Sequence, residues 1–360
     1  MAGFGMFIAD LPEPRANNTR HDLGDILFIA LASVLCGAQS CAEMAEFGRA
    51  KEKLLRRFVA LPHGVPSHDT FSRVFRLLDA EAFGAAFARF TAAFGAALPD
   101  AAVVAIDGKA MRRAYERGKA HMPPVMVTAW AVDTRLALAS VASPDGNEVA
   151  GALEVLEMLD LAGATVTADA LHCHRAMAET IRARGGDYAL ALKGNQSGLL
   201  HDARARLDAA GEVARAETVA TGHGRHERRQ AVVIDAGSMA GDHDFPGLAA
   251  IARLTSQRND GPPVERLYLL SRHLDPERAL AITRAHWDIE NGLHWSLDVV
   301  LAEDALRCRK DNAPANLAVL NRLALNLVRA VDDPKTSLRR RLKKAAWNDD
   351  YLISIISHMR

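Results

Sequence analysis

The first hundred residues carry the hydrophobic pattern of α-helices. In RHDLGDILFIALASVLC, apolar residues recur at helical spacing. Pro62, Gly64 and Pro66 interrupt the pattern, and Ser67 is then a suitable N-cap for the next helix. The segment DAEAFGAAFARFTAAFG continues as a helix whose phenylalanines form one stripe, which we expect to be buried. The pattern predicts an all-helical N-terminal domain over residues 1–98.

Beyond residue 98, short apolar runs replace the helical pattern, and such runs are typical of buried strands. AAVVAIDG, VMVTAWAVD and LALASVAS predict three consecutive strands, and ATVTADAL and DYALALKGN predict two more. EVAGALEVLEMLDL and HRAMAETIRARGG have helical periodicity, and another helix is expected over Gly198–Ala210. The order β-β-β-α-β-α-β predicts an α/β fold over residues 99–212, with a mixed sheet and helices on its faces.

Residues 213–272 interrupt this α/β pattern. ARAETVATG, RRQAVVIDA, LAAIARLTSQR and VERLYLLSR alternate in polarity between Gly, Asp and Pro clusters, which predicts a small antiparallel, β-rich insertion. Helical periodicity returns in DPERALAITRAHWDIENGLHWSLDVVL and at Pro314–Val331, so residues 273–331 should complete the core. Residues 332–360 are expected to form a basic C-terminal tail, because Lys335–Lys344 contain six basic residues and no acidic one.

The overall composition is that of an ordinary globular protein, with 49% hydrophobic and 24% charged residues. The length of 360 residues allows two or three domains. A formal net charge of +0 argues against a strongly basic nucleic-acid-binding protein. Positive charge is nevertheless concentrated in Lys335–Lys344 and in the cluster of Arg307, Arg309 and Lys310. Solvated helix ends would explain such clusters equally well.

The cysteines and the apolar stretches indicate the compartment. The four cysteines form no CxxC pair, so we expect neither a disulfide scaffold nor a structural zinc knuckle, and a reducing cytoplasm is the natural location. The first residues do not have the pattern of a signal peptide. The longest apolar stretch, Ile26–Gly37, is too short to span a bilayer, so we expect no membrane partner.

Two aspartates are each expected at the end of a core strand. Asp107 ends the run AAVVAI and precedes Gly108, and Asp169 ends the run ATVTA. Taken alone, an Asp-Gly pair at a strand end is more often an ordinary turn. Two acids at adjacent strand ends would repel each other unless a cation lies between them, and Mg²⁺ or Mn²⁺ prefers such oxygen ligands. The pair therefore points to a divalent-metal site.

A third acid, Glu290, lies in a segment expected to be helical. It belongs to a set of polar residues at four-residue spacing, a pattern that any solvated helix face also shows: His286, Glu290, His294 and Asp298. Trp287 and Trp295 flank it, and tryptophan is costly to expose. A zinc site is an alternative, with these histidines and His172 and His174 as ligands. However, the spacing is not HExxH, and no Cys/His cluster completes it.

An ordered set of segments carries a family resemblance. AIDGKAMR, TADALHCHRA, ALKGNQ, GHGRHERR and HWDIENGLHWSLDVVLAEDALRCRK resemble the bacterial insertion-sequence DDE transposases of the H-repeat-associated group. RHDLGDILFIALASVLCGAQSCAEMAEFGRAKEKLLRRF and LPHGVPSHDTFSRVF resemble the transposase-associated N-terminal domain of that group. The resemblance covers residues 10–330.

The resemblance implies a ribonuclease-H-like core with a β-rich insertion. It assigns Asp107, Asp169 and Glu290 as catalytic carboxylates that hold two Mg²⁺ or Mn²⁺ ions about 4 Å apart. Of the Tyr-Arg-Glu-Lys signature of related transposases, only the glutamate matches, since Thr283, His286 and Leu297 stand at the other positions. Several side chains are candidates for contacting DNA: Lys193, Arg225, Arg228, Trp287 (which matches a tryptophan of those relatives), Arg307, Arg309 and Lys310.

The implied function is that of a DNA transposase that cuts at terminal inverted repeats and joins the ends to target DNA, acting as a homodimer. Two alternatives stay open at this point: a catalytically silent, domesticated DNA-binding protein of the same ancestry, and a metal-dependent DNA nuclease. A purely structural protein would give no reason for three acids placed in this way.

Overall fold

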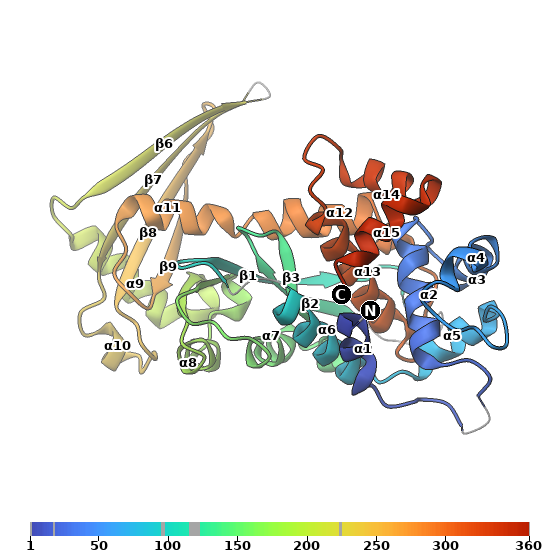
Figure 1. The fold of residues 1–360 in the computed structure, drawn as a ribbon. Helices are drawn as coiled ribbons and strands as arrows, with labels where there is room; N and C mark the ends of the chain where they lie inside the picture. Colours follow the sequence, from blue (N-terminus) through green and yellow to red (C-terminus); the bar gives the residue numbers. More distant parts are fainter. Residues whose placement is uncertain (1, 17–18, 95–97, 115–122, 223–224, 360) are drawn as a thin grey trace.

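One nine-stranded sheet runs through the computed structural model, which describes residues 2–16, 19–94, 98–114, 123–222 and 225–359 (Figure 1). The strand order is β3-β2-β1-β4-β5-β9-β8-β7-β6. The strands are β1 (Val103–Ala110), β2 (Val125–Ala131), β3 (Leu136–Ala142), β4 (Thr165–Ala168), β5 (Asp187–Leu192), β6 (Arg215–Gly222), β7 (Arg225–Asp235), β8 (Ala250–Arg258) and β9 (Val264–Leu270).

The first five strands form the ribonuclease-H-like core. β1, β2 and β3 are antiparallel neighbours, while β4 and β5 join β1 in parallel. The helices α7 (Glu148–Glu157) and α8 (Arg175–Ala183) connect these strands. The β-β-β-α-β-α-β order and the mixed sheet expected from the sequence are therefore confirmed.

The β-rich insertion is not a separate sheet but an extension of the core sheet. β9 pairs antiparallel with β5, and β8, β7 and β6 follow in antiparallel order. Without β9, the strand β5 would be an unpaired sheet edge despite its buried residues, and such edges are normally covered. The far ends of β6, β7 and β8 project from the molecule as an arm (upper left of Figure 1).

Helices cover both faces of the sheet. Because successive side chains of a strand point to opposite faces, Ala105 and Ile106 of β1 belong to different hydrophobic clusters. The cluster with Ile106 includes residues of α7, α8 and α9 (Ser197–Ala209). The opposite face is covered by α11 (Pro276–Ala285) and by the helical turns that follow it.

The N-terminal helices share one core with the C-terminal ones. This core also includes residues of β1, β2 and β3. Its helices are α1 (Ala2–Ala9), α2 (Leu23–Leu35), α3 (Cys41–Ala50), α4 (Glu52–Leu55), α5 (His68–Leu77), α6 (Ala80–Phe94), α13 (Ala313–Ala330), α14 (Leu338–Trp347) and α15 (Asp349–Ser357). The backbone N–H of Phe4 donates to the carbonyl of Met359 at 3.0 Å, so the two ends of the chain lie together.

The segment expected to be a basic tail is folded. It forms α14 and α15, because apolar residues recur at helical spacing between the basic ones, and Leu342, Leu352 and Ile355 are buried. Arg341 is itself buried and donates to the carbonyls of Val328 and Val331. Within the described ranges, no helix is long and apolar enough to cross a membrane.

Candidate active site

Asp107 lies within β1, where the neighbouring strand β4 stops. The sequence pattern predicts Asp107 at a strand end, but β1 continues to Ala110 because β2 still pairs with it there. The parallel pairing of β1 with β4 ends at Ile106 and Ala168. Asp169 follows Ala168 directly, so the two aspartates occupy equivalent positions on adjacent parallel strands and belong to the same sheet face.

Glu290 approaches Asp107 from a helix that is not continuous. The single helix expected over residues 275–301 is instead divided into α11, a π-helical turn (Ile289–His294) and α12 (Trp295–Val299). In the π-helical turn the N–H of Trp295 donates to the carbonyl of Glu290, five residues back. Such wide turns occur frequently at functional sites.

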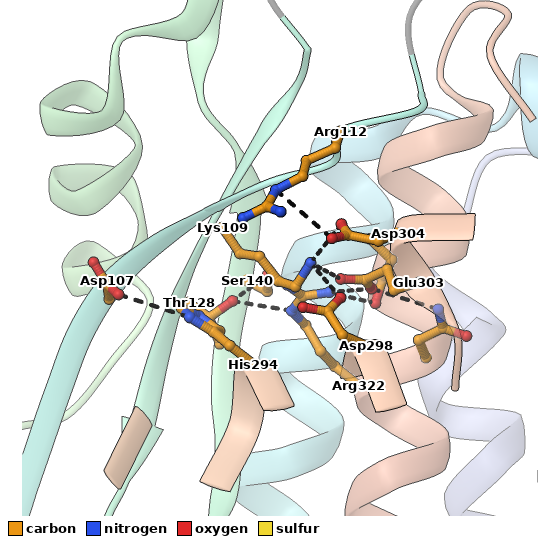
Figure 2. A network of polar contacts seen from close by, with 12 residues as sticks. Asp107, Lys109, Arg112, Thr128, Ser140, His294, Asp298, Glu303, Asp304 and Arg322 are labelled. Atoms are coloured by element: carbon orange, nitrogen blue, oxygen red, sulfur yellow. Dashed lines mark hydrogen bonds and ion pairs between the residues drawn. The ribbon is translucent and has the colours of Figure 1, made fainter. Parts of the chain in front are cut away.

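Three side chains form a tight group at this point. One ligand atom each from Asp107, Glu290 and His294 lies within 4.8 Å of the other two. His294 Nδ1 is 3.1 Å from a carboxylate oxygen of Glu290. The same atom is 3.7 Å from a carboxylate oxygen of Asp107 (Figure 2). His294 Nε2 is buried without a hydrogen-bond partner. Two carboxylates and an imidazole are ligands that a divalent cation accepts, so the residues fit such an ion.

The buried Trp130 and the half-buried Arg329 hold the π-helical turn in place. Arg329 of α13 donates to the carbonyl of Gly292 at 2.6 Å and to Ser296 Oγ at 3.1 Å. Its guanidinium lies 4.6 Å from the ring centroid of Trp130 on β2, and the Trp130 indole N–H donates to Asp288 at 2.9 Å. The turn that carries Glu290 and His294 is thus fixed to both α13 and the sheet.

Asp169 lies at the adjacent strand end, and its carboxylate contacts residues outside this group. Its carboxylate accepts a hydrogen bond from the N–H of Leu171 at 2.9 Å and is 4.0 Å from His172 Nε2. Among the described residues, the group whose ligand atoms are within 4.8 Å of one another does not include Asp169. The structure therefore brings Asp107 and Glu290 together and leaves Asp169 at the adjacent strand end.

The acids of the site influence one another electrostatically. Burial raises the pKa of Asp107 to about 8, and the nearby charges of Glu290 and Glu148 contribute to that rise. The hydrogen bond from His294 lowers the pKa of Glu290 below its ordinary value. Glu148 is an acid that the sequence pattern did not single out. The metal-free site thus favours a proton on Asp107 and a negative charge on Glu290.

This raised pKa predicts how stability depends on pH without metal. The folded protein keeps a proton on Asp107 up to a pKa of about 8, whereas the unfolded chain releases it near the ordinary 3.8. Because the folded state then binds more protons, the contribution of Asp107 to the free energy of unfolding should fall as pH rises through this window. Thermal unfolding in EDTA from pH 5 to pH 8 measures the effect. Asp107→Asn should flatten the profile, and an equally steep profile in this variant would contradict the assignment.

The histidines do not assemble the alternative zinc site. His286 Nδ1 is 3.2 Å from Thr167 Oγ1 on β4, and burial lowers the pKa of His286. His172 is paired with Glu148, and His174 Nε2 is buried without a hydrogen-bond partner. Of the histidines proposed as zinc ligands, His294 is the one that joins Glu290 in the tight group found among the described residues.

The candidate DNA contacts occupy four separate places, three of them close to the core of the sheet and one on the projecting arm. Lys193 is exposed directly after β5, which is parallel to β4, so it lies at the same sheet edge as Asp169. Trp287 lies just before the π-helical turn, with its side chain 49% exposed. The loop after α12 carries Arg307 and Lys310, which are not buried, and Arg309, which donates to the carbonyl of Arg113 at 2.8 Å.

The remaining candidates, Arg225 and Arg228, belong to β7 in the projecting arm. Arg228 forms an ion pair with Glu217 of β6 at 2.7 Å. The side chain of Arg225 lies outside the described part of the chain. Nothing in the described arrangement joins Arg228 to the acidic group.

A buried ion network beside the acids was not anticipated from the sequence. Lys109 Nζ lies 2.7 Å from Asp298, 3.1 Å from Asp304 and 3.7 Å from Glu303 (Figure 2). Glu303 also accepts a hydrogen bond from Arg322 at 2.9 Å. The sequence contains one indication of this network: Lys109 is two residues after Asp107 and therefore on the same face of β1. The network attaches α12 to the strand that carries Asp107.

Comparison with known proteins shows the family of this chain. Residues 98–327 match the family described as Transposase DDE domain, and residues 6–91 match the family described as DDE_Tnp_1-associated. The chain is 31% identical over 98% of its length to "Putative transposase YncI" of Escherichia coli O157:H7, covering 93% of that protein. It is 30% identical over 97% of its length to "H repeat-associated putative transposase YhhI" of Escherichia coli K12, covering 96% of that protein.

Two further similarities complete the comparison. An uncharacterized protein encoded in the dhlA 3′ region of Xanthobacter autotrophicus is 40% identical over 75% of the chain and 95% of that protein. A piggyBac transposase synaptic complex with hairpin DNA aligns with 99% of the chain and 77% of its own, at a TM-score of 0.45 and 11% identity.

The family match over residues 98–327 and the mixed sheet define the class of this protein as a DDE transposase. The chain belongs to the Transposase DDE domain family, within the H-repeat-associated group of bacterial insertion-sequence transposases.

Proposed function

We propose that this protein is a DNA transposase that cuts at the terminal inverted repeats of an insertion sequence and joins the freed ends to target DNA. One observation carries the proposal: Asp107 and Asp169 follow the last paired residues of parallel strands, and Glu290 reaches Asp107 from a separate helical turn. Asp107 and Glu290 are far apart in sequence and have no structural reason to meet, and Asp169 lies at the adjacent strand end. Membership of the DDE transposase family supports the same activity.

In this proposal Asp107, Asp169 and Glu290 hold two Mg²⁺ or Mn²⁺ ions. When bound, such ions activate an attacking water or 3′-hydroxyl and stabilise the leaving oxygen. The protein's own part is to fix the carboxylates before DNA arrives. His294 orients Glu290 through their 3.1 Å hydrogen bond, and the N–H of Leu171 fixes Asp169.

We propose that DNA lies across the exposed side of these acids. Lys193, Arg307 and Lys310 would contact phosphates, while the half-exposed ring of Trp287 would stack on a base. Arg309 would reach a phosphate alongside them. On the arm, Arg225 and Arg228 would bind a more distant part of the same DNA, with Arg228 exchanging Glu217 for a phosphate. Two copies of the chain, one for each end of the element, are the assembly we propose.

The test uses the purified full chain and DNA that carries both ends of the element around its gene. With Mg²⁺ or Mn²⁺ we expect cleavage at the repeat boundaries and joining of these ends to a target plasmid. Removing the metal with EDTA should abolish both products, since the carboxylates do no chemistry without it. Cleavage without joining would indicate a metal-dependent nuclease. Specific binding without cleavage would indicate a catalytically silent DNA-binding protein.

A further inference from the structure

Glu148 is a fourth acid beside the proposed catalytic carboxylates. We propose that it is an additional metal ligand of the site that Asp107, Asp169 and Glu290 form, an inference that rests on the proposed function. Glu148 is the first residue of α7, which Asn147 caps by accepting a hydrogen bond from Ala150. Because β1 and β3 are both antiparallel to β2, they run in the same direction. The helix that follows β3 therefore begins at the sheet edge where the acids lie.

Gly108 allows Glu148 to reach this edge. A Cβ atom at residue 108 would lie 2.3 Å from the carboxyl carbon of Glu148 and 2.5 Å from one of its oxygens. The carboxylate therefore rests directly on the backbone of the residue after Asp107. A side chain at this position would displace it, so the glycine is required for close approach rather than for an unusual backbone conformation.

His172 connects Glu148 with Asp169. Its ring is fully buried, and Nε2 lies 3.2 Å from Glu148 and 4.0 Å from Asp169. The other ring nitrogen, Nδ1, is buried without a hydrogen-bond partner. The polar contacts of this histidine are thus directed at two acids of the cluster, and they hold Glu148 towards the strand ends.

The charge of the cluster supports a metal-binding role for Glu148. Its carboxylate rests against the backbone of Gly108, directly after Asp107, so the negative charges of two acids lie close together at this edge. The nearby buried lysine, Lys109, is occupied by Asp298, Asp304 and Glu303. Four ionised carboxylates carry as much negative charge as two divalent cations carry positive. A cation bound between such acids attracts each carboxylate and offsets the repulsion between them.

A purely structural role makes a different prediction. An acid in the first turn of a helix is stabilised by the helix dipole, and Glu148 also accepts a hydrogen bond from His172. If that were its whole role, Glu148→Gln would lower the stability of the metal-free protein and leave metal affinity unchanged. A metal ligand predicts the reverse, because glutamine keeps the hydrogen-bond acceptor but removes one of the repelling charges.

The experiment measures Mn²⁺ binding to the full chain without DNA, by electron paramagnetic resonance of the free ion, together with thermal unfolding in EDTA. We expect Glu148→Gln to bind Mn²⁺ at least tenfold more weakly, or to bind one ion fewer, without a lower melting temperature in EDTA. Glu157→Gln, at the other end of α7, is the matched control and should behave like the parent. Gly108→Ala should also weaken binding, because the added methyl group displaces Glu148 while leaving its charge.

The outcomes distinguish this inference from the proposed function. If Glu148→Gln and Gly108→Ala bind Mn²⁺ as the parent does while Asp107→Asn loses binding, Glu148 is not a ligand and the metal site itself stands. If the parent binds no Mn²⁺, or Asp107→Asn binds it unchanged, the proposed metal site and this inference both fail. Should Glu148→Gln not fold, Gly108→Ala and Glu148→Asp still decide the question, since both retain the charge but move the carboxylate.

Discussion

Replacing Asp107 by asparagine is expected to reduce strand cleavage by at least a thousandfold, about 4 kcal/mol of transition-state stabilisation. The asparagine side chain would keep the size of the aspartate but could not supply the negative charge of a metal ligand. Asp107 is also a member of the tight group with Glu290 and His294, so its loss removes a charged ligand from that group. Single-turnover cleavage of end-containing DNA with Mg²⁺ measures the effect.

The fold of this variant should be unaffected. In the metal-free protein Asp107 already favours its protonated form at neutral pH, because its pKa is raised to about 8. Melting in EDTA should therefore be no lower than that of the parent. Glu179→Gln is a suitable control, since this residue of α8 is exposed and should leave cleavage intact. Cleavage by Asp107→Asn within about tenfold of the parent would show that Asp107 is not a metal ligand.

Replacing Arg322 by methionine should cause the largest loss of stability, about 3–5 kcal/mol in the free energy of unfolding. Arg322 and Glu303 are both fully buried, with a 2.9 Å contact between them, and Arg322 also donates to Thr128 at 3.0 Å (Figure 2). Methionine would leave Glu303 charged in the interior, with the 3.7 Å contact to Lys109 as its remaining ion pair among the described residues. Urea unfolding followed by circular dichroism measures the change.

Two further variants identify the cause of that loss. Adding Glu303→Gln to Arg322→Met should recover much of the stability, because the unpaired buried charge is then removed as well. Arg56→Met breaks an exposed ion pair with Glu52 on the protein surface and should change the free energy of unfolding by less than about 0.5 kcal/mol. Equal losses in the single and double variants would mean that lost packing, rather than the unpaired charge, destabilises the protein.

The order of the core strands could be predicted from the sequence because each strand is a short apolar run followed by a turn. The run AAVVAIDG and the run ATVTADAL also placed two acids on neighbouring strands, and their parallel pairing agrees with that placement. Glu290 was found through the resemblance and not through periodicity, since its four-residue spacing also describes a solvated face. Periodicity could not reveal the π-helical turn, because Arg329 and Trp130, which fix it, are distant in sequence.

Other features depend on long-range contacts that no local pattern contains. β9 extends the core sheet because β5 offers it an open edge, and a hydrophobic run such as VERLYLL is equally suited to a separate hairpin. In the sequence, Glu148 looks like an ordinary acid in the first turn of a helix. Its contacts with Gly108 and His172 are seen only in the folded structure. The many basic residues of α14 suggested a solvated tail, although the apolar positions between them bury this helix against the rest of the chain.

The shared core of the first and last helices has a consequence for how the protein is made. Leu352 and Ile355 of α15 belong to the same hydrophobic cluster as Phe28 of α2. A backbone hydrogen bond from Phe4 to Met359 also joins the first helix to the end of the last one. A growing chain on the ribosome therefore cannot fully bury the apolar surface of α2 until α15 has emerged. A gene copy truncated before the codons of α15 would yield a chain whose N-terminal helices stay partly uncovered and prone to aggregation and proteolysis.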